Sequence, residues 1–210
     1  MKLKKTLALI IAVLILLGTV SVTAFAGESE KESYVARMYI CTRQQFLGHV
    51  WLYFENLTDH EITVGCYTLP PEQGVTVSAY SIGRKDGKGN YYNIDGYCLH
   101  KYGSGNTTCA GMDITEEQLQ IVTNQLLSRN TWSGTKNCCY VAATIWNSVS
   151  PRKIKVVLLP LLMKTKIKKI KCETPNFYLP TKEQCFKQVG TGGNATLKQC
   201  SSGSYNHYVG

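Results

Sequence analysis

The chain has 210 residues, of which 23 are Lys or Arg and 14 are Asp or Glu, so its formal net charge at pH 7 is +9. This length suits a single domain with a sizeable hydrophobic core. The positive charge favours anionic surroundings such as wall polymers or phospholipid headgroups. Nucleic acid is not expected as a partner of an exported chain, which the N-terminal residues described next predict.

The first 26 residues have the pattern of a secretory signal peptide. A start containing three lysines precedes an unbroken apolar run over residues 7–17, and Ala24-Phe25-Ala26 places small residues at the expected cleavage positions. We therefore predict that residues 1–26 are a cleaved signal and that the protein is secreted. The alternative is an uncleaved membrane anchor, since the apolar run with its extension to Phe25 is just long enough to span a bilayer.

All nine cysteines lie after this signal, in a part of the chain whose export would permit disulfides. An odd number leaves at least one thiol unpaired or paired between chains. Four disulfides and one free nucleophile fit the number, as do other arrangements. No CxxC pair occurs and the chain has only four histidines, so we predict no metal site, and no organic cofactor is implied. The cysteines are Cys41, Cys66, Cys98, Cys109, Cys138, Cys139, Cys172, Cys185 and Cys200.

Five segments rich in Val, Ile and aromatic residues follow a short polar lead-in and predict β-strands. The third is expected to complete a hairpin with the second, across a polar turn. The fifth follows a loop of alternating glycine and basic residues. The predicted strands are 34–41, 47–55, 62–68, 75–81 and 91–97.

Two amphipathic helices are predicted after these strands. Thr115 and Gln118 have the spacing of a capping box and predict a helix that ends near Arg129. Asn137 is expected to cap a second helix, which places Cys138 in its first turn. The inward side of this second helix consists of Val141, Ala142, Ile145 and Val149.

Residues 152–171, from Arg152 to Lys171, combine two short apolar runs with eight basic residues and no acidic residue. We interpret this segment as a buried hairpin or strand with solvated basic flanks; the alternative is contact with a membrane or another anionic surface. Thr181 with Gln184 predicts a last short helix that reaches Val189, and a tail rich in glycine and serine follows.

The predicted domain organisation is a signal peptide, a lead-in with the first strand, one α+β domain and a flexible C-terminal tail. In the α+β domain, an antiparallel sheet packs against the helix that carries Cys138. The corresponding boundaries are 1–26, 27–46, 47–189 and 190–210.

His49 and Cys138 are the candidate catalytic residues. His49 begins an apolar strand after Gly48, and Cys138 begins a helix after Asn137. A cysteine acts as a nucleophile only as a thiolate, and a helix N-terminus together with a nearby imidazole lowers its pKa. Cys139 is the rival nucleophile, but it lies about 100° further round the helix, so both sulfurs cannot face one imidazole.

The chain resembles the bacterial permuted papain-like proteins related to NlpC-type cell-wall peptidases. The resemblance depends on Gly48-His49-Val50-Trp51, on Tyr92-Asn93-Ile94-Asp95, and on Trp132 leading into Asn137-Cys138 and Ala142. Trp146-Asn147-Ser148-Val149-Ser150 belongs to the same pattern, and Thr174-Pro175 matches the segment that closes such domains. In the permuted members the histidine strand precedes the cysteine helix, as here.

This resemblance implies a papain-like fold in which Cys138 is the nucleophile, His49 is the general base and the Cys138 amide donates to the oxyanion. Relatives place a polar orienting residue on the strand after the histidine strand. The corresponding stretch here has no His, Asn, Asp or Glu. The candidates for the third group are therefore Asn93 and Asp95, together with Cys66 and Tyr67 of that stretch; a main-chain carbonyl or a water molecule is the alternative. Trp51, Trp132 and Asn137 are candidates for lining the cleft.

Three functions follow as expectations. The first is a secreted thiol hydrolase, an amidase or peptidase that acts through a thioester on cell-wall peptide or another extracellular amide. The second is a catalytically inactive exported binding module of the same fold, stabilised by disulfides. The third is a lipid-directed acyltransferase, which the basic apolar segment 152–171 suggests.

Overall fold

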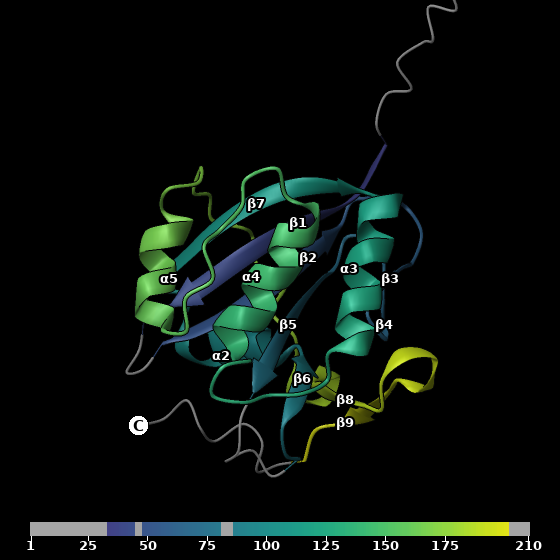
Figure 1. Cartoon of the computed structure of the whole chain (residues 1–210). Coiled ribbons are helices and arrows are strands. Elements are labelled where there is room, and N and C mark those ends of the chain that lie inside the picture. The colour runs from purple at the N-terminus through teal and green to yellow at the C-terminus, as the bar shows by residue number, and fades with distance from the viewer. Residues whose placement is uncertain (1–32, 45–47, 81–85, 202–210) are drawn as a thin grey trace, which may run out of the picture. The chain divides into compact units, whose positions relative to one another are not determined.

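The computed structural model describes residues 33–44, 48–80 and 86–201 (Figure 1). The predicted signal peptide, residues 1–26, lies outside these ranges. Within them the chain is an α+β protein with one large antiparallel sheet and four α-helices. The α+β class predicted from the sequence is therefore confirmed.

The large sheet has seven strands in the order β7-β1-β2-β5-β6-β8-β9, and every neighbouring pair is antiparallel. A separate hairpin, β3-β4, follows β2. The strands are β1 Tyr34–Arg43, β2 His49–Asn56, β3 Ile62–Val64, β4 Tyr67–Leu69, β5 Gly74–Tyr80, β6 Gly89–Tyr92, β7 Thr107–Thr115, β8 Phe186–Val189 and β9 Thr196–Gln199. The helices are α2 Ile94–Tyr102, α3 Glu116–Ser128, α4 Cys138–Val149 and α5 Pro160–Ile167, with 3-10 turns at Lys182–Gln184 and Gly192–Asn194.

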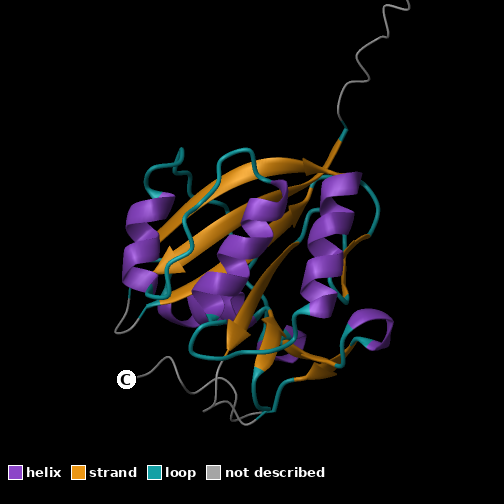
Figure 2. Ribbon diagram, viewed as in Figure 1, coloured by secondary structure: helices purple, strands orange, loops and turns teal. Residues whose placement is uncertain are grey.

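Alternate residues of β2 face two different layers of side chains. Val50, Leu52 and Phe54 belong to the main core, to which α3, α4 and α5 contribute. Trp51 and Tyr53 belong to a smaller cluster that includes a leucine of α2. Figure 2 shows α4 between α3 and α5 over one face of the sheet. His49 is in step with Trp51 and Tyr53, so β2 starts with its histidine on the side of α2.

The pairing of β2 with β5 covers only part of β2. It begins at Leu52, which faces Val77, and continues to Glu55, which faces Gly74. The first three residues of β2 pair with β1 alone, and the last three residues of β5 pair with β6 alone. The two central strands therefore separate at the end of β2 that carries His49.

Helix α4 is almost entirely buried because small and apolar residues occupy most of its surface. Eight of its twelve residues are buried, and Ala142 and Ala143 bring its backbone close to the sheet. Asn137 caps it as predicted, since its side chain accepts hydrogen bonds from the amides of Cys139 and Tyr140 at 3.1 and 3.2 Å. The helix therefore begins at Cys138, as the sequence indicates.

Two of the predicted strands differ in the structure. The segment 62–68 is not one strand paired with β2. It is divided by a turn at Gly65, whose φ of +63° is in the left-handed region, into the two strands of its own hairpin. The segment 91–97 is strand only as far as Tyr92, because Asn93 adopts a φ of +65° and α2 begins after it.

The remaining corrections concern elements that the sequence did not predict. Strand β7 pairs with β1 along its whole length. It was not predicted because it contains Thr, Gly and Asp in place of a run of Val, Ile and aromatic residues. Segment 152–171 contains α5, which starts at Pro160, rather than a hairpin or strand. The helix predicted up to Val189 is a 3-10 turn followed by β8, and the predicted tail 190–210 contributes β9 before the undescribed residues 202–210.

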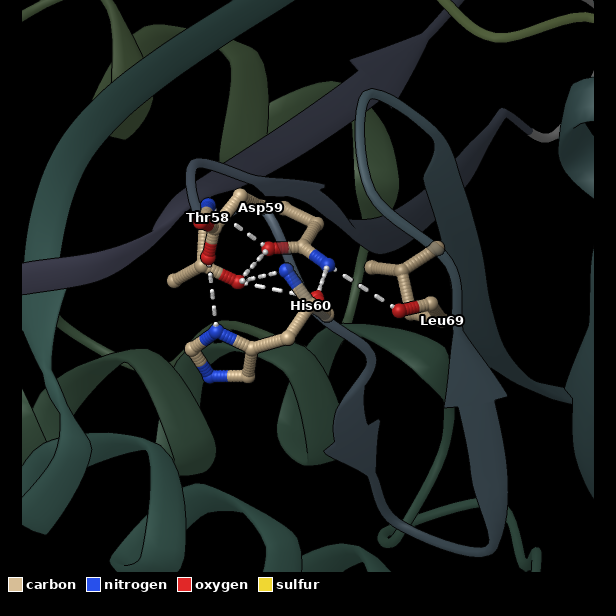
Figure 3. Close-up of polar contacts among 5 residues, drawn as sticks. Thr58, Asp59, His60 and Leu69 are labelled. Carbon is tan, nitrogen blue, oxygen red and sulfur yellow. Dashed lines mark hydrogen bonds and ion pairs between the residues drawn. The ribbon is translucent and has the colours of Figure 1, made fainter.

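A polar turn fixes the far end of β2 (Figure 3). The Asn56 amide donates to the carbonyls of His60 and Leu69 at 2.7 and 3.1 Å, and its oxygen accepts from the backbone and hydroxyl of Thr58 at 2.8 Å. The exposed ring of His60 contacts Asp59 at 3.1 Å. His60 is therefore occupied in a turn at the opposite end of the strand from His49.

The capping box of α3 yields a stability prediction. The Thr115 hydroxyl accepts from the Gln118 amide at 3.3 Å, and the Gln118 side chain accepts from the Thr115 amide at 3.0 Å. Thr115→Ala is expected to lower the free energy of unfolding by about 1 kcal/mol in urea titrations followed by circular dichroism. Thr165→Ala, at an exposed position of α5, is the control and is expected to change it by less than about 0.5 kcal/mol. Equal effects would contradict the role of the cap.

Candidate active site

His49 is positioned by the turn that precedes β2. Gly48 has a φ of +72°, and an added Cβ would lie 2.9 Å from the Cβ of Pro160 and 3.2 Å from the carbonyl oxygen of Arg43. Only glycine adopts this positive φ and fits these close contacts without strain. The Thr42 hydroxyl donates to the His49 carbonyl at 3.0 Å, so the backbone of the histidine is held on its β1 side as well.

Cys138 is the first residue of α4 and is 8% exposed. The side chain of Asn137 accepts hydrogen bonds from the backbone amides of Cys139 and Tyr140 and not from that of Cys138. The sulfur accepts a hydrogen bond from the backbone amide of Val50, in the part of β2 that does not pair with β5. Separation of the two strands thus leaves room for the helix terminus to reach the sheet.

The structure brings Cys138 and His49 together. The pKa of the Cys138 thiol is held well below its usual value by a hydrogen bond with the Cys139 thiol, by the charge and hydrogen bond of His49 and by the Val50 amide. These contributions outweigh burial, which acts in the opposite direction. A sulfur at a helix N-terminus beside an imidazole is the environment in which cysteines become reactive thiolates.

Cys139 has the opposite environment. It is fully buried in the main core, and its pKa is raised by its hydrogen bond with Cys138, by burial and by the charge of that neighbour. A thiol that donates to its neighbour and stays protonated supports the thiolate next to it. The complete burial and raised pKa of Cys139 therefore favour Cys138 over Cys139 as the nucleophile.

Asp95 provides the third polar group. Its Oδ1 lies 3.4 Å from Nε2 of His49, and it also accepts a hydrogen bond of 2.6 Å from the Tyr80 hydroxyl. The Ser78 hydroxyl donates to the other carboxylate oxygen. At 3.4 Å the contact with the imidazole is longer than an ordinary hydrogen bond and acts chiefly through charge. With Nε2 directed at Asp95, Nδ1 is the ring nitrogen left for the sulfur.

Aromatic rings hold the imidazole in its plane. The ring of His49 stacks on Tyr80 with centroids 4.3 Å apart and interplanar angle 20°, and it lies 6.3 Å from the ring of Trp51. Tyr80 thus contacts the imidazole with its face and Asp95 with its hydroxyl. The sequence reasoning did not identify Tyr80 or Ser78; their only signal is alternate spacing on β5, the strand next to the histidine strand.

The other residues considered as the group that orients His49 have structural roles. Asn93 donates to the Tyr67 hydroxyl at 3.3 Å and to the Gln184 carbonyl at 3.1 Å, and thereby holds the turn between β6 and α2. Cys66 contacts the Tyr92 hydroxyl at 3.6 Å in the turn of the small hairpin. Of the four candidates, Asp95 is the one that the structure places beside His49.

The three residues proposed to line a cleft have different environments. Trp51 is buried in the cluster next to α2, and its indole Nε1 has no hydrogen-bond partner among the residues that the structure describes. Trp132 is half-buried and packs on the main core. Asn137 donates to the Leu158 carbonyl at 2.7 Å, so it links the start of α4 to the segment before α5.

Within the described ranges, no three His, Cys, Asp or Glu side chains are grouped so that they could hold a metal ion. None of the described helices has the length and apolar character needed to cross a bilayer. Comparison with protein-family models, curated proteins and solved structures found no match to this chain.

The lowered pKa of Cys138 predicts a pH profile for alkylation by iodoacetamide. Because this pKa lies well below that of an ordinary thiol, Cys138 should still be labelled at pH values at which ordinary thiols have become unreactive, and its labelling rate should fall only as the pH drops through the lowered pKa. His49→Ala raises the pKa, so labelling at acidic pH should fall by about tenfold for each unit of increase. Mass spectrometry of peptides identifies the labelled sulfur. Cys139→Ala should leave labelling at Cys138; transfer of the reactivity with Cys139 would contradict the assignment.

Asp95→Asn tests the third group. The substitution keeps the size of the side chain but removes the charge facing His49, so the alkylation rate of Cys138 at mildly acidic pH should fall by about tenfold or more. Asp113→Asn is the matched control, because that aspartate pairs with Arg37 at 3.1 Å on the surface. The account of Asp95 fails if both variants label at the wild-type rate while remaining folded.

Proposed function

We propose that this protein is a thiol hydrolase of the permuted papain-like, NlpC-type group and that Cys138, His49 and Asp95 form its catalytic unit. The observation that carries the proposal is the convergence of these residues from α4, β2 and α2. Asp95 faces one ring nitrogen of His49, and the histidine supports a lowered pKa of the Cys138 thiol. The arrangement supports nucleophilic catalysis because each group has a partner for its charged form.

The proposed reaction is acyl transfer. The Cys138 thiolate attacks the carbonyl carbon of an amide, and the developing oxyanion accepts a hydrogen bond from the Cys138 amide at the helix N-terminus. The imidazolium of His49 then gives its proton to the leaving amine as the C–N bond breaks, which leaves a thioester. Water attacks this thioester while His49 accepts its proton; the C–S bond then breaks, the acid leaves, and the Cys138 thiolate and the His49 imidazolium are restored.

The proposed substrate class is a peptide or other amide outside the cell, with cell-wall peptide as the leading candidate. This proposal is supported by the resemblance of residues 47–189 to the cell-wall peptidases and by the export signal expected at residues 1–26. The buried Asp95 supports an active enzyme over a silent binding module, because a carboxyl group at 3% exposure lies against the His49 ring, where it can stabilise an imidazolium formed during the reaction.

Incubation with purified cell-wall peptide and with peptide anilides tests the proposal. Wild-type protein is expected to release new amino groups and to form a transient acyl adduct on Cys138, seen as a mass increase. Cys138→Ala should lower the rate by about 1,000-fold or more. Cys66→Ala, which removes a thiol from the small hairpin, should leave the rate unchanged. Equal rates for the wild type and Cys138→Ala, or Cys138 held in a disulfide, would favour the silent binding module.

A further inference from the structure

A cluster of exposed apolar residues lies in the segment after α4 and in the first turn of α5. Half of the ten large apolar residues that the described part of the chain exposes fall within seven positions there, with exposed fractions from 37% to 62%. Scattered exposed leucines are ordinary, but a contiguous set usually marks a contact surface. We call this set the leucine patch; it consists of Val156, Leu158, Leu159, Leu161 and Leu162.

The fold holds the leucine patch outward on a fixed support. Ile154 on one side and Met163 and Ile167 on the other are buried in the main core. The Asn147 side chain donates to the Ile154 carbonyl and accepts from its amide, both at 2.7 Å. The leucines are therefore exposed although the segment that carries them is anchored, so their exposure is a property of the folded chain.

The leucine patch adjoins the candidate catalytic residues. Asn137, immediately before Cys138, donates to the Leu158 carbonyl at 2.7 Å. Pro160, at the start of α5, closely approaches Gly48, immediately before His49. Figure 1 shows the connection after α4 returning alongside that helix before α5 begins. The same short segment therefore contacts the residues that precede both the nucleophile and the base.

The charge around the patch favours one kind of partner. Eight basic residues and no acidic residue lie in the sequence 152–171 that contains the patch. Lys155, Lys168, Lys169 and Lys171 are exposed. A second copy of this chain would bring two sets of lysines together, whereas a bilayer with anionic headgroups would neutralise the lysines and bury the leucines. We propose that the leucine patch and its lysines dock the protein on an anionic membrane surface.

This docking would place the N-terminus of α4, with Cys138, at the membrane surface, where membrane-bound substrates are concentrated. Binding needs only the apolar and charged side chains and not the nucleophile. The proposal is therefore independent of the proposed hydrolase activity, and Cys138→Ala should bind vesicles as the wild type does.

Sedimentation with vesicles tests the proposal on residues 27–210, the chain expected after cleavage of the signal, because the apolar run of the signal would itself bind vesicles. Wild-type protein should bind vesicles of phosphatidylcholine with 30 mol% phosphatidylglycerol about tenfold more tightly than pure phosphatidylcholine, and added salt should weaken that binding. Leu159→Ser with Leu161→Ser should lower the affinity about tenfold or more. The matched control is Leu57→Ser with Leu179→Ser. These two leucines lie outside the patch, and their exposed fractions of 48% and 47% are within the range of the patch residues.

Two further measurements test the contribution of the lysines and the location of the membrane contact. Lys168→Gln with Lys169→Gln should weaken binding to the anionic vesicles more than Lys88→Gln with Lys198→Gln, which removes two exposed lysines elsewhere. Vesicles should also slow hydrogen exchange in peptides that contain α5. Equal losses for patch and control variants, or no protection of α5, would overturn the proposal. A dimer in solution that the Leu159→Ser, Leu161→Ser variant dissociates would overturn it too and assign the patch to a second copy.

Discussion

The site depends on the separation of β2 from β5. Their pairing stops at Leu52 and Val77, so the first residues of β2 keep only their β1 neighbours. In a continuous sheet the backbone would form a barrier between a helix on one face and a helix on the other. Here the helix terminus with Cys138 reaches the Val50 amide, while His49 faces Asp95 on the α2 side. The thiol, the imidazole and the carboxylate meet because the sheet opens at this point.

The partners of each group explain why a buried site tolerates charge. A thiolate and a carboxylate removed from water are costly unless each has partners. The thiolate has the neighbouring thiol, the imidazole and a backbone amide. The carboxylate of Asp95 has the hydroxyls of Ser78 and Tyr80 as well as the His49 ring. A thiol with a lowered pKa and a carboxyl group thus both interact with one imidazole, and negative charge on either of them favours the protonated form of the ring.

Local signals in the sequence predicted the pairing of His49 with Cys138 but did not single out the carboxyl group beside the imidazole. Asn137 marks the start of α4, and Gly48 marks the turn before His49, because capping and left-handed turns depend on neighbours in the chain. Asp95 was only one of several candidates, since the residues around it predict a strand and the left-handed turn at Asn93 starts a helix instead. Ser78 and Tyr80 depend on which strands adjoin, a property of the whole sheet. For the same reason the sequence did not predict β7, because its pairing with β1 joins residues far apart in the chain.

The most direct test of the account is the protonation state of His49, measured by nitrogen-15 NMR of the histidine rings against pH. The account predicts that both ring nitrogens carry protons at pH 7 in the wild type, because the thiolate and Asp95 stabilise the imidazolium. In Cys138→Ser, which lacks the thiolate, the ring should be neutral at pH 7 with its proton on Nε2, facing Asp95. A neutral His49 ring in both proteins at that pH would contradict the ion pair on which the proposed site depends.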